Sequence, residues 1–286
     1  MRVKSRWPGT YGFARVQGMK RFAYRMLLLS LLAGLSGAGV AADGGEVADV
    51  FSGHVARVLD GDTVVLDNDI RIRLLDINTP EIAHDGRSAE PYAYEAANAL
   101  RRLVFGQYVT IQTGPQKKDR YDRVLGHIFL PNGGWVNGTL VRDGYAHVYT
   151  FAENAVYAPE LLAYEKQARE SKRGLWALPR WQVREALRCC AHDDIGTFKL
   201  VEGRVVAAVH VKNSSGGRTY LNFGKDWRTD FSVFVTDKDN RWFKKAGIVN
   251  IADYYRGKNV RIHGYLQPVN GVLVRVTHPA QIEVLE

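Results

Sequence analysis

The sequence has little cysteine and no long apolar run after its first 42 residues. Its only two cysteines, Cys189 and Cys190, are adjacent, which excludes the disulfide framework that holds many small secreted domains. Adjacent cysteines rarely meet the geometry of a mutual disulfide. They therefore form either an intermolecular bridge or two thiols packed under a helix. With His192 they offer too few ligands for a zinc site, at unsuitable spacing.

Acidic residues are missing from residues 1–42, which contain seven Lys or Arg. Basic residues precede an apolar run, Met26–Leu32, and small residues follow it from Ala33 to Ala42. This order is typical of a secretory signal peptide, whereas an uncleaved membrane anchor needs about 20 apolar residues. We expect 1–42 to be removed as a signal peptide, leaving a secreted or periplasmic protein without stable membrane association. Met19 is an alternative start.

The positive charge is unevenly placed. The formal net charge is +9, but seven cations lie in 1–42, so the rest of the chain carries only +2. Residues 43–196 hold 18 cations against 22 acids, and residues 197–286 hold 14 against 8. Any attraction for a polyanion such as DNA or RNA is therefore expected mainly from the C-terminal part.

At 286 residues the chain has room for two domains. Turn residues separate short apolar runs that predict five strands in the first half, with a helix after the third strand. The predicted strands are Val55–Leu59, Thr63–Leu66, Ile70–Leu75, a run through Val109 and Ile111, and Val124–Leu130; the predicted helices are Pro91–Phe105, Thr139–Asp143 and Pro159–Ser171. This order predicts an OB-type five-stranded barrel with packed helices over residues 50–180.

The remaining sequence predicts a helical connector at 181–196 and a second, smaller OB-like β-barrel over 197–286. Its five predicted strands are Val201–Val211, Tyr220–Phe223, Phe231–Val235, Val260–Leu266 and Val272–Val276. The fold class is therefore mainly β with helices, α+β. No clear sequence repeat links the two halves.

Three polar clusters fall on the first predicted barrel: Asp60–Thr63, Arg73–Glu81 and Asp119–Arg123. Each alone is typical of a turn, a loop before a helix or a solvated charge run. Together they supply what phosphodiester cleavage needs. Carboxylate, amide and carbonyl oxygens are calcium ligands, a carboxylate near the attacking water serves as general base, and arginine forks stabilise phosphoryl charge.

The chain resembles the staphylococcal nuclease family over nearly all of 50–180. The motifs that carry the resemblance are Asp-Gly-Asp-Thr at 60–63, Arg-Leu-Leu at 73–75, Thr-Pro-Glu at 79–81, Asp-x-Tyr-x-Arg at 119–123, a Val-Asn stretch before Gly144-Tyr145-Ala146, and Gly174-Leu175-Trp176. Their order and spacing are specific to the family.

The resemblance implies a role for each matching residue. Asp62 would be a calcium ligand, and Thr79 would offer its backbone carbonyl. Glu81 would be the general base. Arg73 and Arg123 would hold the phosphate, and Tyr121 would contact the nucleotide. The implied reaction is a cut by water, attacking in line, that leaves a 3′-phosphate.

Two positions depart from the family pattern. Asn78 stands where the family has its second metal carboxylate, so we expect an uncharged amide ligand and weaker calcium binding. Asp76 would replace that carboxylate only if the loop shifted register. Asp122 stands where the family usually has glycine; its carboxylate either pairs with Arg123 and competes with phosphate, or points outward in the turn.

The segment Thr219–Phe231 resembles an extension found in bacterial members of this nuclease group, as does the ending His278–Glu283. Aromatic side chains beside cations are how OB barrels hold single strands. We assign Phe223 and Phe231 to the core, and name Trp227 and Arg228 as candidate substrate-binding residues.

The sequence thus predicts a monomeric calcium-dependent nuclease that acts on DNA, RNA or both. The alternative is a catalytically weak or inactive nucleic-acid-binding protein on a nuclease-derived fold. Asn78 favours the alternative, whereas Asp62, Arg73, Glu81 and Arg123 favour the enzyme.

Overall fold

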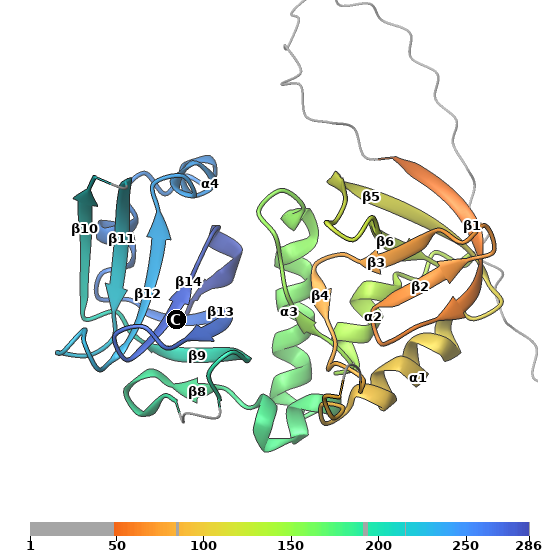
Figure 1. The fold of residues 1–286 in the computed structure, drawn as a ribbon, viewed down its shortest axis with the longest axis horizontal. Coiled ribbons are helices and arrows are strands. Elements are labelled where there is room, and N and C mark those ends of the chain that lie inside the picture. Colours follow the sequence, from red (N-terminus) through yellow and green to blue (C-terminus); the bar gives the residue numbers. More distant parts are fainter. Residues whose placement is uncertain (1–48, 84–85, 191–193, 215, 286) are drawn as a thin grey trace, which may run out of the picture. The chain divides into compact units, whose positions relative to one another are not determined.

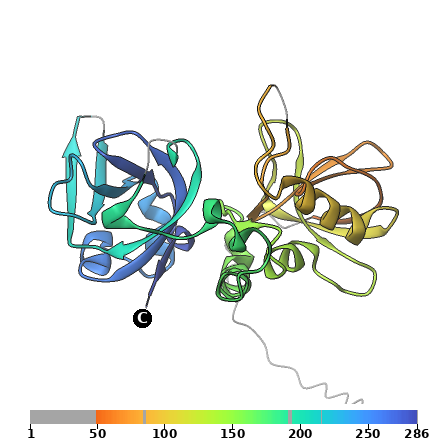
Figure 2. The ribbon, with the colours of Figure 1, turned by 90° about the horizontal axis from the view of Figure 1, so that it is seen from below.

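The computed structural model describes residues 49–83, 86–190, 194–214 and 216–285. The predicted signal peptide and His192 lie outside the described residues. Residues 44–286 form one compact unit, which contains two large hydrophobic clusters from different stretches of chain. One stretch, orange to green, builds the first set of strands, and another, teal to blue, builds the second (Figures 1 and 2). The α+β fold class is confirmed; the predicted boundaries 50–180, 181–196 and 197–286 stay a prediction.

The first set is a closed ring of five strands, here called the N-terminal barrel, in the order β1-β2-β3-β6-β5 (Figure 1). The strands are β1 (Val50–Val58), β2 (Thr63–Leu66), β3 (Arg71–Leu74), β5 (Tyr108–Lys118) and β6 (Val124–Phe129). Every neighbouring pair is antiparallel except β3 and β6, which are parallel. This arrangement confirms the predicted OB-type barrel.

Helices and a small sheet cover the barrel. They are α1 (Ala93–Val104), α2 (Val136–Arg142) and α3 (Ala158–Glu170), with β4 (Ile77–Asn78) paired to β7 (His147–Val148). Helix α1 buries Ala96, Leu100 and Val104, which recur every four residues and so share one face. The helix ends before Gly106, whose φ of 71° suits glycine.

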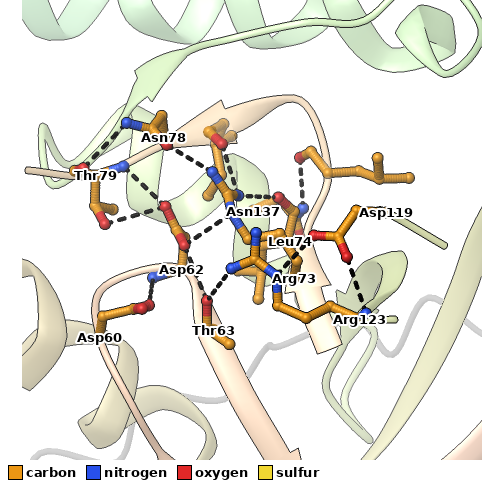
Figure 3. A network of polar contacts seen from close by, with 12 residues as sticks. Asp60, Asp62, Thr63, Arg73, Leu74, Asn78, Thr79, Asp119, Arg123 and Asn137 are labelled. Atoms are coloured by element: carbon orange, nitrogen blue, oxygen red, sulfur yellow. Dashed lines mark hydrogen bonds and ion pairs between the residues drawn. The ribbon is translucent and has the colours of Figure 1, made fainter. Parts of the chain in front are cut away.

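Buried Asn137 fixes the segment that follows β3. Its Oδ1 accepts a hydrogen bond from the Ile128 backbone at 3.0 Å, and its Nδ2 donates to the Leu75 carbonyl at 2.9 Å. A fully buried amide that satisfies two separate backbone groups ties β6 and the segment after β3 to α2. Figure 3 shows this amide behind the polar cluster that β3 carries.

The second set of strands, here called the C-terminal barrel, pairs in the order β10-β11-β12-β14-β13-β9-β8, with β15 on β13 (Figure 1). The strands are β8 (Arg184–Glu185), β9 (Phe198–Arg204), β10 (Ala207–Asn213), β11 (Gly216–Asn222), β12 (Phe231–Thr236), β13 (Asn259–Gln267), β14 (Val272–Arg275) and β15 (Ile282–Val284). Helices α4 (Asn240–Lys245) and α5 (Ile251–Tyr255) lie between β12 and β13.

The single strand predicted at Val201–Val211 is wrong, because the chain changes partner there. Val205 donates its backbone hydrogen bond to Lys258 next to β13, whereas Val206 donates to Asn222 of β11. The chain therefore bends at a corner between β9 and β10. The two strands are neighbours in the sequence but are separated in the sheet by β11, β12, β14 and β13. The corner connects the β10 end of this order to β9 through the chain, and β12 and β14 pair in parallel. The C-terminal barrel therefore repeats the strand order of the N-terminal barrel.

The predicted helical connector is wrong as well. Its described residues, 181–190 and 194–196, form no α-helix. They include the two-residue strand β8, which pairs in parallel with β9, and a 3-10 turn at Ala186–Arg188. Ala186 is buried in the C-terminal core, so packing against that core fixes the conformation of this segment. Cys189 and Cys190 are partly buried and pack against the C-terminal core.

Candidate active site

A pocket of about 560 Å³ at the N-terminal barrel brings together most of the predicted site residues. Its lining includes Asp62, Arg73, Asn78, Glu81, Tyr121 and Arg123. These side chains come from the β1–β2 turn, β3, the β4 segment and the β5–β6 loop. Segments up to 60 residues apart in the chain therefore converge on one cavity.

Asp62 is buried in a tight turn between β1 and β2. Its backbone N–H donates to Asp60 Oδ1 at 3.0 Å, which is the local bond expected of an Asp-Gly-Asp turn. A Cβ on Gly61 would lie 2.5 Å from Thr79 Oγ1, so only glycine lets the Thr79 loop approach. Thr79 then donates to Asp62 Oδ2 from its backbone N–H at 3.1 Å and its hydroxyl at 3.2 Å (Figure 3).

Arg73 links Asp62 to Asn78. Its Nε lies 3.0 Å from Asp62 Oδ1, and its Nη2 donates to Asn78 Oδ1 at 2.6 Å. Its Nη1 donates to the carbonyls of Leu74 and Ile77. The side chain of Arg73 is only 13% exposed. Arg73 leaves β3 on the predicted face and lines the pocket. Its guanidinium is also held by hydrogen bonds to the segment that follows β3.

Asp60 adds a second carboxylate that was not assigned a role from the sequence. Burial, and next the negative charge of Asp62, raise the pKa of Asp60 to about 6. The two carboxylates repel each other in a partly buried turn, and a bound cation would relieve that repulsion. With the Asn78 amide and the Thr79 carbonyl beside them, the donors are all oxygens, as a hard divalent cation prefers. The residues present therefore fit calcium.

Arg123 is oriented by Asp119, a second residue that was not assigned. Its Nε donates to Asp119 Oδ2 at 2.7 Å, and its backbone N–H donates to Oδ1 of the same carboxylate at 2.9 Å. Burial opposes ionisation of Asp119, but these hydrogen bonds outweigh it and lower the pKa of that carboxyl. The charged pair fixes the guanidinium at the edge of the pocket.

Asp122 points away from Arg123, which settles the two alternatives left by the sequence. Its carboxylate pairs with Lys118 at 2.7 Å and is 79% exposed. The residue has a φ of 60°, a left-handed conformation that glycine adopts most easily and aspartate tolerates. The backbone therefore explains why this position suits glycine, and the carboxylate does not compete for Arg123.

Asp76 does not replace the missing metal carboxylate. Its φ is 61°, and its side chain is fully buried with Oδ2 3.6 Å from His127 Nε2. Burial raises its pKa, opposed by His127. The loop keeps its register, so Asn78 and not Asp76 stands next to Asp62.

Glu81 and Tyr121 lie at the rim. Glu81 is exposed and lines the pocket, and its backbone N–H donates to Glu90 Oε2 at 3.1 Å. The Tyr121 ring is 55% exposed, with the guanidinium carbons of Arg120 and Arg123 at 4.7 and 5.6 Å from its centroid. An exposed ring beside two cations is suited to stacking on a base.

Trp227 and Arg228 are not part of this pocket. Arg228 lies over the Trp227 ring at 4.7 Å, and Trp227 lines a separate cavity on the C-terminal barrel. The pocket at the N-terminal barrel is instead completed by Tyr149 and by Tyr265 of β13. Neither tyrosine has a local motif, so no sequence signal identified them, whereas Asp60 and Asp119 stand inside motifs already noted.

One further group of potential ligands consists of Glu165, His263 and Glu283, whose ligand atoms lie within 4.8 Å of one another. Arg261 donates to Glu283 at 3.0 Å, and Arg169 lies 3.7 Å from Glu165. Two guanidinium groups already neutralise these carboxylates. The group is therefore an ionic network and not a cation site.

A family model described as staphylococcal nuclease homologue matches residues 71–178. An uncharacterised endonuclease of Escherichia coli is 39% identical over 141 residues, 47% of this chain and 84% of that protein. A micrococcal nuclease of Shigella flexneri is 36% identical over 151 residues, 48% and 82% of the two chains. A thermonuclease of Staphylococcus hyicus is 31% identical over 126 residues, 43% and 74%. Within the part of the chain that the structure describes, no helix is long and apolar enough to cross a membrane.

Proposed function

The chain belongs to the staphylococcal nuclease family and is a nuclease, and from this we propose that it hydrolyses DNA, RNA or both with calcium at Asp62. One observation carries the proposal: the pocket of about 560 Å³ gathers Asp62, Arg73, Glu81 and Arg123 on its lining. A carboxylate base and two arginines on one cavity are what phosphodiester hydrolysis requires.

Asp62, Asn78 and the Thr79 carbonyl would hold the calcium, with Asp60 adding charge behind them. The bound cation would supply charge neutralisation at the phosphate and orientation of the attacking water. Glu81 accepts the proton of that water. Arg123, held by Asp119, donates to the phosphoryl oxygens, and Tyr121 stacks on the nucleotide.

Arg73 has a double role in this proposal. Its contacts with Asp62 and Asn78 orient the ligand oxygens when substrate is absent. To grip a phosphate, Arg73 must exchange the Asn78 contact for a phosphoryl oxygen. This exchange would leave Asn78 Oδ1 open to a cation.

A second candidate is a nucleic-acid-binding protein with little catalysis. The observation that favours it is the 2.6 Å bond from Arg73 to Asn78 Oδ1, which satisfies the amide without any metal. If that bond persists, calcium affinity is low and the chain binds strands without cutting them.

The decisive assay titrates calcium against a fixed amount of protein with plasmid, single-stranded DNA and RNA, and repeats it with chelator. We expect cleavage that requires calcium and is lost in Glu81→Gln. The Asn78→Asp variant should need less calcium, because a charged ligand replaces an amide. Binding without cleavage at millimolar-scale calcium would reject the enzyme in favour of the second candidate.

We also propose that the protein is exported and monomeric. The charged, apolar and small segments of residues 1–42 support export. N-terminal sequencing of the protein from the cell exterior or periplasm should find a start near residue 43. Light scattering on the purified protein tests the monomer.

A further inference from the structure

A second cavity lies on the C-terminal barrel, away from the residues assigned above to hydrolysis. Its volume is about 580 Å³, and its lining comes from β10, β11, β12, β14 and two loops. We call it the C-terminal groove. The lining is largely apolar, and Arg218 is the one charged residue among the lining residues. A concave, mostly apolar surface with a single charged group is typical of a ligand-binding site.

The strand register places a row of side chains on this outer face. Val209 of β10 pairs with Tyr220 of β11, which pairs with Phe234 of β12. The alternate residues Leu221 and Val233 are fully buried in the core. Because side chains alternate across a strand, Tyr220 and Phe234 face outward together, with ring centroids 6.2 Å apart. Phe234 is only 8% exposed and does not line the groove, so Tyr220 is the ring of this pair on which a planar ligand can stack.

Cations accompany the aromatic rings. The Arg218 guanidinium lies 5.2 Å from the centroid of the Phe234 ring. Trp227, in the loop after β11, is 48% exposed at the groove. Arg228 covers its ring at 4.7 Å. The exposed Trp227 ring and the Arg218 guanidinium on one groove suit a ligand that has both flat apolar faces and negative charge.

The groove's position in the fold points to the same ligand. Strands β11 and β12 are the second and third strands of this barrel, and residues Val269 and Asn270 belong to the loop between its last two main strands, β13 and β14. In OB barrels, that sheet face and that loop bind oligonucleotides.

Charge complementarity separates a nucleic acid from an apolar peptide. Residues 197–286 carry 14 Lys or Arg against 8 acidic residues, and none of the residues lining the groove is acidic. A polyanion is attracted to such a surface, and an uncharged or basic peptide is not. A single strand fits better than a duplex, since its bases are free to stack on side chains.

We propose that the C-terminal groove binds single-stranded nucleic acid, with bases stacked on Trp227 and Tyr220 and a phosphate near Arg218. The inference rests on the proposed nuclease function, because it supplies a second hold on the strand that the N-terminal barrel cuts. It assigns the strand-holding role to the sheet face and Trp227. Arg228 acts through the Trp227 ring.

The test measures fluorescence anisotropy of a labelled oligonucleotide of about 12 bases with the purified protein in chelator, so that nothing is cut. Trp227→Ala and Tyr220→Ala should each weaken binding about 5- to 100-fold, the usual loss for one stacked base. Arg218→Gln should lower the salt slope of binding by about 0.7, the share of one phosphate contact. Trp242→Ala is the matched control, because Trp242 also lies between cations, Arg241 and Lys245, but outside the groove.

Several outcomes overturn the proposal. Wild-type affinity in both aromatic variants, or a loss as large in Trp242→Ala, would remove the groove from binding. Duplex bound as tightly as single strand would reject the stacking mode. Circular dichroism of each variant checks folding, and Arg218→Gln tests the groove without deleting a ring.

Failure of this inference can be told from failure of the proposed function. Hydrolysis of a dinucleotide by the unmodified protein with calcium tests the active site alone. The difference in oligonucleotide binding in chelator between the unmodified protein and the groove variants tests the groove. Cleavage of the dinucleotide together with unchanged binding by the groove variants would refute only the groove.

Discussion

The two barrels share one strand order, but the loops that connect their strands differ. In each, the third and fifth strands are parallel, and helices are inserted between the third and fourth. The loop between the last two strands is charged in the N-terminal barrel, at Asp119–Arg123, and uncharged in the C-terminal barrel, at Pro268–Gly271. The same scaffold therefore carries a proposed hydrolytic site in one case and a proposed stacking surface in the other, as expected if function is set by loops.

Buried ion pairs show the same contrast. Asp62 and Arg73, 8% and 13% exposed, face a pocket. Glu283 and Arg261, 16% and 14% exposed, lie in an ionic network without a ligand site. Removing a charged group should affect the rate of cleavage in the first case and the free energy of unfolding in the second.

The largest expected effect is on the rate of cleavage in the N-terminal barrel. Arg123→Lys keeps the charge but loses the planar fork that Asp119 orients. The value of kcat should fall about 10²- to 10³-fold, the usual cost of one donor to the transition state. Thermal unfolding should change little, because Arg123 lies at the pocket edge.

Its control is Arg57→Lys, which alters an exposed pair with Asp69 outside the pocket. That variant should keep wild-type kcat. A kcat for Arg123→Lys within three-fold of wild type would remove Arg123 from the chemistry and weaken the functional half of the comparison.

The next largest effect is on the acid stability of the C-terminal barrel. Burial opposes ionisation of Glu283, but its bonds to His263 and then Arg261 outweigh this and lower its pKa to about 2. A carboxyl with a lowered pKa stabilises the fold above its ordinary pKa of about 4.5, and the gain is lost as the pH falls toward 2. At neutral pH this carboxylate contributes about 3 kcal/mol to the free energy of unfolding.

Chemical denaturation of the wild type and Glu283→Gln across pH 2 to 7 measures this contribution. The difference in unfolding free energy should be greatest above pH 5 and vanish near pH 2. The groups that face Glu283 remain in both proteins: His263, Arg261, Arg169 and Glu165. A difference independent of pH would show that packing, not charge, stabilises this network.

A pair of glycine substitutions compares the turns of the two barrels. Gly271 has a φ of 77°, and a Cβ there would lie 2.4 Å from the Thr229 carbonyl oxygen, in the loop that carries Trp227. Gly133 has a φ of 82° and no atom within 4 Å of its Cβ position. Gly271→Ala should therefore cost about 2 kcal/mol or more and weaken oligonucleotide binding, whereas Gly133→Ala should cost about 1 kcal/mol.

Urea denaturation of both variants gives the two costs. Equal costs would mean that the loop at Gly271 moves freely, and the fixed position of Trp227 would then be in doubt.

Much of the N-terminal barrel could be predicted from the sequence because its signals are local. Alternating apolar residues predicted that Arg73 leaves the core of the barrel, and the resemblance to the nuclease family grouped Asp62, Arg73 and Arg123 in one site. The corner at Val205–Val206 could not be predicted, since a continuous apolar run does not reveal a change of hydrogen-bond partner. Tyr265 joins the pocket from a strand just over 200 residues after Asp62, and no local pattern encodes such a contact.

The contact between Arg73 and Asn78 was missed for a related reason. The sequence suggests a free guanidinium and a free amide five residues apart. The two-residue strand β4, paired to β7, turns the amide back onto β3. A short strand of this kind has too few residues for its pattern to be recognised.

The smallest expected effect concerns Asp122. The left-handed φ of 60° favours glycine there, and the Lys118 pair that would be lost is exposed and so contributes little. Asp122→Gly should change the unfolding free energy by about 1 kcal/mol or less, because relief of strain is offset by the greater freedom of glycine in the unfolded chain. The value of kcat should stay within about two-fold.

Asp122→Asn separates charge from backbone, since asparagine also tolerates this conformation. A large rise of kcat in both variants would mean that the Asp122 carboxylate competes with phosphate for Arg123 in solution. A rise in Asp122→Gly alone would instead locate the effect in loop flexibility. With neither, the β5–β6 loop acts as a rigid support for Asp119 and Arg123, as the loop at Gly271 does for Trp227, and the two barrels then use one rigid loop position to present two different chemistries.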